Sequence, residues 1–322
     1  MSETLPLVSI GLPIFNRPEG LKIALDCLIN QTYDNIEIII ADNCSPNPEV
    51  EKIAREYLER DNRIRYYRHE ENLGWGYNTN FVIEKAKGNY FMRATDDDWW
   101  DESFVEKIMH LMLKDQEIVL GFSNFIEVDV QGKKSRIHPD NHLQLLEAFT
   151  TSDKVMNIKN YVSQLERFGK SNLYFSIFKV DLLRSDFVRR TLEKEVLAGD
   201  LLINLYCLLR GKLVIVPDVL LKITFGNEKN YEMGESKSKI LDFLFIRYDF
   251  HNFKSIKSKW QKYFTTQLSI VSSSSFKKNE KIKIKLAVTK RMLAFHSELI
   301  HTNTEVRGLS IFRKLRNKYS LK

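Results

Sequence analysis

The sequence predicts an α/β protein with a doubly wound, mostly parallel sheet, followed by a basic, mainly helical carboxyl-terminal region. Two observations indicate this architecture. Short apolar runs alternate with segments whose apolar residues recur at helical spacing, the pattern of repeated β-α-β units. Residues 251–322 carry 17 Lys and Arg against three Glu, a net charge of +14, so the other 250 residues carry −7. The two parts of the chain are therefore electrostatically different.

The expected strands lie in the first 225 residues. The second of them reads "IEIIIA" (36–41) and is expected to be buried on both faces, as strands of parallel sheets are. The other strands are expected at 7–14, 63–67, 89–94, 117–125 and 213–217.

Apolar residues at helical spacing predict a helix after most of these strands. These helices are expected around 21–29, 50–58, 76–87, 104–112 and 201–210. The pattern weakens between about 130 and 170, where "DVQGKKSRIHPDNH" predicts a turn and an exposed loop. Residues 224–239 are polar and contain glycine, which indicates a loop or a linker.

Composition narrows the class of protein. A length of 322 residues suits either one large α/β domain with an appendage or two modest domains. A composition of 43% hydrophobic and 28% charged residues is ordinary for a globular chain. The first residues lack the basic start and apolar run of a signal peptide, and no apolar stretch reaches the ~18 residues of a membrane span. Three cysteines without metal-type spacing argue against a disulfide framework or a zinc site. We therefore expect a cytoplasmic protein with reduced thiols.

Three polar loops follow expected strands and should meet at one edge of the sheet. They are "FNRPEG", "DNCSPN" and "TDDDWW". In open α/β sheets, ligands bind outside the carboxyl ends of the strands. The loops therefore form the expected binding site.

Asp96, Asp97 and Asp98 stand side by side in the third loop. Adjacent carboxylates repel one another unless a positive charge compensates. A Mg²⁺ or Mn²⁺ ion would do so and would recruit phosphate oxygens. The alternative is structural, since acids before a helix are favoured by the helix dipole.

Two more aspartates have a functional and a structural interpretation. Asp42 follows the second strand and either forms a turn or accepts hydrogen bonds from a base or a ribose. Asp200 precedes an apolar helix and is either its N-cap or a general base. Both alternatives stay open at this point.

Three segments together resemble the family 2 glycosyltransferases of the GT-A fold, whose sheet is Rossmann-like. They are "VSIGLPIFNRPEGLKIALDCLINQTYDNIEIIIADNCSPN", "NLGWGYNTNFVIEKAKGNYFMRATDDDWWDESF" and "AGDLLINLYCLLRGKLVIVPD". The resemblance runs from about residue 5 to 225. It implies an inverting enzyme with a nucleotide-sugar donor, most often UDP-linked, bound with Mg²⁺ or Mn²⁺.

The resemblance also implies roles for single residues. The donor nucleotide would be bound by Pro13, Asn16, Arg17, Asp42 and Asp96. Asp97 would hold the metal. Asp98 is a second metal candidate, because "TDDD" replaces the usual acid-any-acid pattern and leaves open whether Asp96 or Asp98 assists Asp97. Asp200 would be the catalytic base, although Gly199 stands where the family has Glu.

The expected reaction is sugar transfer to a hydroxyl of a glycan or lipid-linked acceptor in cell-surface polysaccharide synthesis. One alternative is a nucleotidyltransferase acting on sugar phosphates, but "IGLPIFNRPEG" lacks the Gly-, Arg- or Lys-rich phosphate loop such enzymes carry near the start. The other is a non-catalytic, basic nucleic-acid-binding protein. The positive charge is confined to the tail, so we expect no nucleic-acid partner. The catalytic domain is expected at 1–230, with a nucleotide-sugar half at 1–128 and an acceptor half at 129–230, and the helical region at 231–322.

The tail combines basic side chains with an apolar stripe. Ile256, Trp260, Tyr263 and Phe264 recur at near-helical spacing among lysines, and "GLSIFRKLRNKYSLK" repeats the combination. Such a pattern suits an anionic bilayer, which would give the protein a peripheral position on the inner face of the cell membrane. The alternative is a helical bundle that packs on the catalytic domain.

Overall fold

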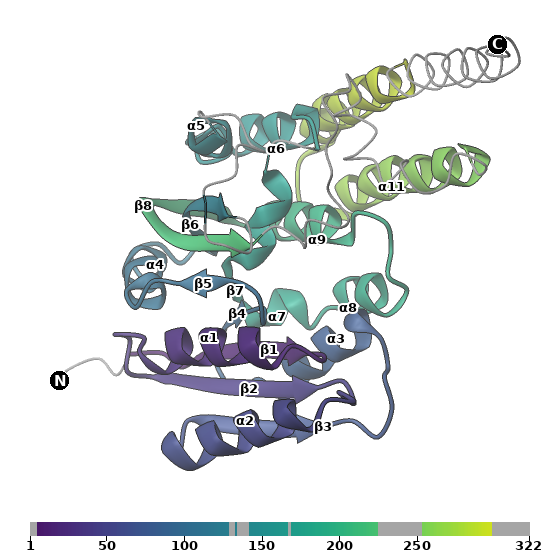
Figure 1. The fold of residues 1–322 in the computed structure, drawn as a ribbon. Coiled ribbons are helices and arrows are strands. Elements are labelled where there is room, and N and C mark those ends of the chain that lie inside the picture. The colour runs from purple at the N-terminus through teal and green to yellow at the C-terminus, as the bar shows by residue number, and fades with distance from the viewer. Residues whose placement is uncertain (1–4, 129–132, 134–141, 167–168, 225–252, 298–322) are drawn as a thin grey trace, which may run out of the picture.

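A mixed β-sheet forms the centre of the computed structural model, which describes residues 5–128, 133, 142–166, 169–224 and 253–297 (Figure 1). Within these residues the sheet has the strand order β3-β2-β1-β4-β7-β6-β8-β5. The strands are β1 (Val8–Ile14), β2 (Ile36–Asp42), β3 (Ile64–Arg68), β4 (Tyr90–Arg93), β5 (Trp99–Trp100), β6 (Ile118–Val128), β7 (Ile177–Lys179) and β8 (Lys212–Thr224).

The predicted doubly wound, mostly parallel sheet is confirmed. β1 pairs in parallel with β2 and β4, β2 with β3, and β6 with β8. β7 runs antiparallel between β4 and β6, and β5 is antiparallel to β8. β5 is only two residues long and β7 only three, too short to leave a periodic signal in the sequence.

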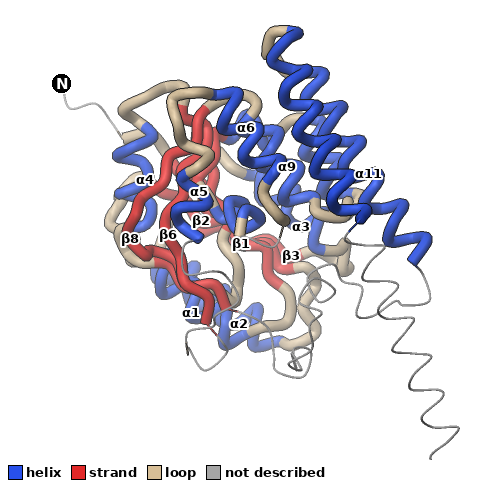
Figure 2. The backbone as a smooth tube through the Cα atoms, turned by 90° about the horizontal axis from the view of Figure 1, so that it is seen from above, coloured by secondary structure: helices blue, strands red, loops and turns tan. Residues whose placement is uncertain are grey.

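Helices lie on both sides of the sheet, as the view from above shows (Figure 2). Those of the first half are α1 (Pro18–Ile29), α2 (Pro48–Arg60), α3 (Trp75–Lys85) and α4 (Phe104–Met112). The second half adds α5 (His142–Glu147), α6 (Lys154–Ser163), the 3₁₀ helix η1 (Lys170–Phe175), α7 (Val180–Leu183), α8 (Asp186–Glu193) and α9 (Gly199–Leu208). α6 forms in a segment where the apolar pattern is weak. Asp153 stabilises its start as N-cap, accepting hydrogen bonds from the backbone N–H groups of Val155 and Met156.

The carboxyl-terminal helices pack into the core. α11 (Phe253–Ser273) lies against α9, and residues 278–297 form a further helix beside it. Trp260, Tyr263 and Phe264 are 2%, 0% and 0% exposed, and the rings of Trp260 and Phe295 have centroids 4.7 Å apart. The bilayer contact expected of these three residues is therefore wrong, and the packed helical bundle is confirmed for them. The Ile256 side chain and residues 308–322 lie outside the described parts.

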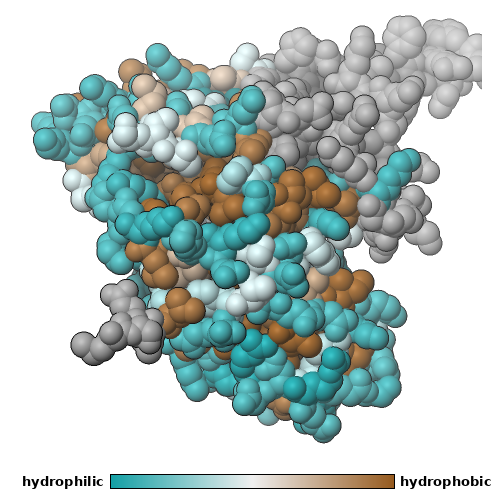
Figure 3. Space-filling model, turned by 90° about the vertical axis from the view of Figure 1, so that its left-hand side faces the viewer, coloured by the Kyte–Doolittle hydropathy of each residue, from teal (hydrophilic) through white to brown (hydrophobic). Residues whose placement is uncertain are grey.

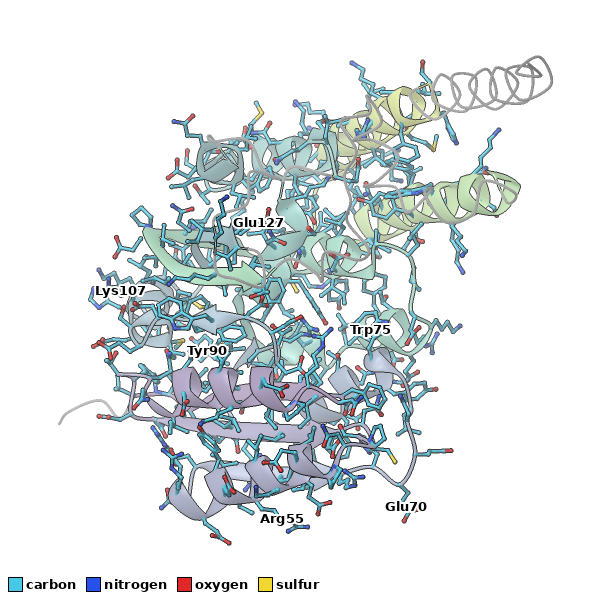
Figure 4. The ribbon with its side chains drawn as sticks, in the orientation of Figure 1. Arg55, Glu70, Trp75, Tyr90, Lys107 and Glu127 are labelled. Atoms are coloured by element: carbon cyan, nitrogen blue, oxygen red, sulfur yellow. The ribbon has the colours of Figure 1, made fainter. Side chains whose placement is uncertain are left out.

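The carboxyl ends of β1 and β2 mark the edge that holds the polar loops. Ile14 and Asp42 are aligned partners at these ends. Trp75 lies on the side to which β1 points, whereas Lys107 lies on the opposite side (Figure 4). That opposite side is mostly hydrophilic with an apolar band across its middle (Figure 3). Among the described helices, none combines the length and apolarity that a membrane span requires.

Candidate active site

An open pocket of about 560 Å³ lies at the carboxyl edge of the sheet. The loops after β1, β2 and β4, the start of α3 and the loop before α9 supply its walls. This is the position expected for ligands of open α/β sheets, and the volume suits a small organic ligand. The three polar loops predicted to converge therefore do so.

The loop after β1 brings Pro13 and Arg17 to the pocket, as predicted. Asn16 does not line it. The backbone N–H of Asn16 donates to Ser45 Oγ at 2.8 Å, and its side-chain oxygen accepts from the N–H of Asn47 at 3.2 Å. Its φ of 58° is in the left-handed region that asparagine tolerates. Asn16 therefore braces the loops after β1 and β2 against each other.

Asp96 and Asp97 face Arg17. The Arg17 Nη1 atom lies 3.2 Å from Asp96 Oδ1 and 2.6 Å from Asp97 Oδ2. Gly20 allows this approach, because a Cβ atom there would lie 1.9 Å from the Asp96 carbonyl oxygen. Burial raises the pKa of the Asp96 carboxyl to about 6, and the charge of Arg17 limits this rise. Arg17 is thus the positive charge that the clustered aspartates require in this structure.

The same two carboxylates fit a divalent cation. They converge on one point, which a cationic nitrogen now fills, and the Asp97 side chain is 39% exposed toward the pocket. No set of three His, Cys, Asp or Glu side chains gathers for a metal within the described ranges. Mg²⁺ commonly binds one or two carboxylates and takes its remaining oxygens from substrate phosphates and water. The donor set is therefore adequate for such an ion together with a phosphorylated ligand.

Asp98 is not brought to the pocket. It is 3% exposed, its Oδ1 accepts from the Thr224 N–H at 2.8 Å, and its Oδ2 accepts from the Thr95 hydroxyl. Burial raises its pKa to about 7, and the charge of Asp97 adds to the rise. Asp98 ties the acidic loop to the end of β8. Of the two candidates left open by the sequence, the geometry favours Asp96 as the partner of Asp97.

Asp42, the last residue of β2, is fully buried and hydrogen-bonded to the loop that follows it and to β3. Its Oδ1 accepts from the Ser45 N–H at 2.8 Å, and its Oδ2 accepts from the Tyr66 hydroxyl at 3.0 Å and from Arg68 Nη1. It does not line the pocket, whereas its neighbour Asn43 does. The turn-forming interpretation describes this geometry. Contact with a base requires Tyr66 or Arg68 to release the carboxylate.

Asp200 lies on the first turn of α9 but does not cap it. The N-cap residue is Ala198, with a φ of 56°, so the N-cap alternative for Asp200 is wrong. Asp200 is not among the residues that line the pocket. Arg93, whose positive charge acts on the Asp200 carboxyl, does line it. Burial raises the pKa of Asp200 to about 6, opposed by backbone N–H groups of the helix start and then by Arg93 and Lys170. A carboxylate with a pKa of about 6 is mostly ionised at neutral pH and able to accept a proton.

Among the pocket-lining residues whose side chains had no predicted role are Arg93, Trp75 and Glu195. Arg93 ends β4, Trp75 begins α3 and is 47% exposed, and Glu195 lies in the loop before α9 with a φ of 43°. A charged residue at the end of the buried run "YFMR" was a signal for Arg93. The position of Glu195 depends on α8 packing against α3, where a Cβ atom on Gly76 would lie 2.0 Å from the Leu192 carbonyl oxygen.

Known sequences match this chain over the part that builds the pocket. Residues 9–185 match the family model for glycosyl transferase family 2. An uncharacterized glycosyltransferase of Rickettsia felis is 34% identical over 143 residues, 44% of this chain and 23% of that protein. One from Methanocaldococcus jannaschii is 26% identical over 254 residues, 77% of this chain and 81% of that protein. The match thus spans about a quarter of the Rickettsia relative and most of the Methanocaldococcus one.

Solved structures share the fold. S. aureus TarS in complex with UDP-GlcNAc is similar with a TM-score of 0.58 at 13% identity, over 89% of this chain and 73% of that one. The mannosyltransferase PcManGT from Pyrobaculum calidifontis, in complex with GDP-Man and Mn²⁺, gives a TM-score of 0.51 at 14% identity, over 99% and 89%. At these identities the likeness concerns the fold alone.

Proposed function

The chain belongs to glycosyl transferase family 2, has the GT-A fold and is a glycosyltransferase, and from this premise we propose its substrates and mechanism. The donor is a nucleotide-diphospho-sugar, preferably UDP-linked. The acceptor is a hydroxyl of a glycan or a lipid-linked glycan of the cell surface. The sugar is transferred with inversion. Family membership decides against the nucleotidyltransferase and the nucleic-acid-binding alternatives.

The arrangement of Arg17, Asp96 and Asp97 carries this proposal. Two carboxylates and a guanidinium meet at the carboxyl edge of a parallel sheet, inside a pocket of suitable size. TarS and PcManGT have been solved with UDP-GlcNAc and with GDP-Man and Mn²⁺. Their common fold supports a nucleotide-sugar in the corresponding pocket here.

Different residues of the pocket act on the diphosphate and on the sugar of the donor. Asp97, with Asp96, would hold Mg²⁺ or Mn²⁺, which supplies Lewis-acid neutralisation of the departing diphosphate. Arg17 and Arg93 line the same pocket and add fixed positive charge for the negative charge that develops there. Trp75 presents an aromatic face and Glu195 a carboxylate, groups that can orient sugar hydroxyls and rings.

Asp200 is the proposed general base. The acceptor hydroxyl becomes a competent nucleophile as Asp200 takes its proton. The oxygen then bonds to the anomeric carbon while the bond from that carbon to the diphosphate oxygen breaks, and the electron pair leaves with the nucleoside diphosphate. A single in-line displacement of this kind inverts the anomeric configuration.

A donor screen tests the proposed function. The purified chain is incubated with UDP-, GDP- and dTDP-sugars, with Mn²⁺ or EDTA, and release of nucleoside diphosphate is measured. We expect metal-dependent release from one donor class, fastest for a UDP-sugar. Turnover of no nucleotide-sugar, or equal rates with EDTA, would contradict the proposal.

The proposed base sets a pH dependence. Because burial raises the pKa of Asp200 to about 6, the carboxyl is protonated at lower pH and cannot accept a proton. We expect kcat to fall as the pH drops below about 6 and to level off above about 7. Steady-state rates between pH 5 and 8 at saturating donor measure this limb. A flat profile down to pH 5 would remove Asp200 from this role.

We further propose that the protein contacts an anionic membrane through the outer face of helix 278–297. Ile282, Leu286 and Leu293 form one stripe and are 58%, 54% and 61% exposed. Exposed lysines flank the stripe at Lys283 and Lys290. Like charges disfavour a second copy on this face, whereas an anionic bilayer is complementary to it. A lipid-linked acceptor would then be present at the same membrane surface as the enzyme.

Vesicle binding tests this surface. We expect cosedimentation with vesicles containing about 30% phosphatidylserine at low salt, and release near 0.5 M salt, where the Debye length is roughly 4 Å. Changing Ile282, Leu286 and Leu293 together to Ser should abolish binding. Ile23→Ser, at a site 54% exposed elsewhere, is the matched control. Surface variants are preferable to removing the tail, because α11 packs into the core. Equal recovery of wild type and triple variant excludes this face.

A further inference from the structure

A group of buried charges joins the carboxyl-terminal helices to the rest of the molecule. Glu166, just after α6, is 2% exposed, and Lys170, at the start of η1, is 0% exposed. Arg291, on helix 278–297, is 6% exposed and donates through Nη2 and Nε to Glu166 Oε2 at 2.6 and 3.2 Å. Lys170 Nζ lies 3.6 Å from Glu166 Oε1. Buried charges persist only where they are paired, so these three side chains depend on one another.

Lys170 connects this group to α9. Its Nζ donates to the backbone oxygens of Tyr161 at 3.0 Å and Gln164 at 2.7 Å, and its own carbonyl accepts from Asn204 Nδ2 at 3.2 Å. The Tyr161 hydroxyl donates to the carbonyl of Leu201 at 2.9 Å. Leu201 directly follows Asp200. The first turn of α9 is therefore held through Leu201 by Tyr161, and its second turn through Asn204 by the backbone of Lys170.

Charged groups of this region change the pKa of the Asp200 carboxyl. Arg93 and Lys170 both lower its pKa against the larger effect of burial. Three buried tyrosines face it from α6, η1 and α11 and are neutral at physiological pH: Tyr161, Tyr174 and Tyr263. Burial lowers the pKa of the Lys170 ammonium group to about 8, and the charges of Glu166 and Asp200 both oppose this shift. The two carboxylates therefore compete for the charge of Lys170.

We infer that Arg291, Glu166 and Lys170 position the Asp200 carboxylate, which makes the carboxyl-terminal helices part of the catalytic unit. Arg291 neutralises Glu166 and so leaves the charge of Lys170 available to Asp200. This inference rests on the proposed role of Asp200 as base. It replaces the expected separation of a catalytic domain from a helical region near residue 230 by one functional unit.

Two charge-changing variants test the inference through the pH profile of kcat. Lys170→Met removes a positive charge near Asp200. The acid limb, which is the fall of kcat at low pH, should therefore move to higher pH by about half a unit or more. Glu166→Gln removes a competing negative charge, so the limb should move to lower pH. Opposite shifts are a signature that lost packing alone does not produce. If Lys170→Met fails to fold, the downward shift of Glu166→Gln remains decisive.

Controls separate positioning from stability and from the proposed base itself. Arg291→Lys keeps the charge and should leave the pH dependence of kcat unchanged. Lys262→Met, at an exposed position of α11, should change neither the pH dependence nor Tm. UDP affinity should stay within about twofold in every variant. Unmoved limbs in folded Lys170→Met and Glu166→Gln enzymes overturn the inference. Full activity of Asp200→Asn instead overturns the base assignment on which it rests.

Discussion

Replacing Asp200 with Asn is expected to lower kcat for sugar transfer by roughly 10²–10⁴-fold, the usual contribution of a positioned general base. Asparagine has nearly the same shape but cannot take a proton from the acceptor hydroxyl. The donor site is built from other residues, so UDP affinity should be unchanged. Transfer rates at saturating donor and acceptor, with calorimetric titration of UDP, measure the two quantities separately.

Glu195 provides the matched comparison for Asp200. It is the carboxylate that lines the pocket next to α9, and it is the alternative acceptor of the proton. Glu195→Gln should change KM more than kcat, because its expected role is to bind a sugar hydroxyl. A large loss of kcat in Glu195→Gln with a normal rate in Asp200→Asn would exchange the two roles.

Asp97→Asn is expected to remove the metal-dependent part of donor affinity. Outer-shell partners of metal sites alone are worth about 10- to 100-fold in affinity, and a direct ligand should contribute at least as much. Titrations of UDP into the wild type and the variant, each with Mn²⁺ and with EDTA, give the metal-dependent component. It should be present in the wild type and absent in Asp97→Asn.

Asp98→Asn is the control that distinguishes neighbouring carboxylates. Burial raises the pKa of Asp98 to about 7, so a neutral amide resembles the form that is already populated near neutral pH. Asp98 also contacts Thr95 and Thr224 rather than the pocket. This variant should melt at a different temperature but keep metal-dependent UDP binding. Loss of that binding in Asp98→Asn, with retention in Asp97→Asn, would reverse the assignment.

The sequence predicts the sheet well because buried parallel strands leave an unmistakable pattern. β2 is buried at every position, and its run of β-branched isoleucines is typical of a strand covered on both faces. The convergence of Arg17, Asp96 and Asp97 follows from that topology, since strand ends meet at one edge. Single side chains are harder to place. Asp98 differs from Asp97 by one position, yet it turns toward Thr224, a residue 126 positions away that no local pattern connects to it.

The tail illustrates the same limit from the other direction. An apolar stripe among lysines fits a bilayer or a protein core equally well, because both bury the same side chains. The ring of Phe295 against Trp260 decides for the core, and that contact comes from tertiary packing. Glu195 could not be predicted either, since its place in the pocket depends on how α8 meets α3.

The ion pairs of Arg17 have a consequence for the order in which ligands assemble. A metal ion that arrives alone must compete with a guanidinium already placed between Asp96 and Asp97, and it offers that guanidinium no new partner. A nucleoside diphosphate provides one, because Arg17 can turn its half-exposed side chain from the carboxylates to the phosphates. We therefore expect metal and donor to bind with positive cooperativity, each increasing the affinity of the other by the same factor.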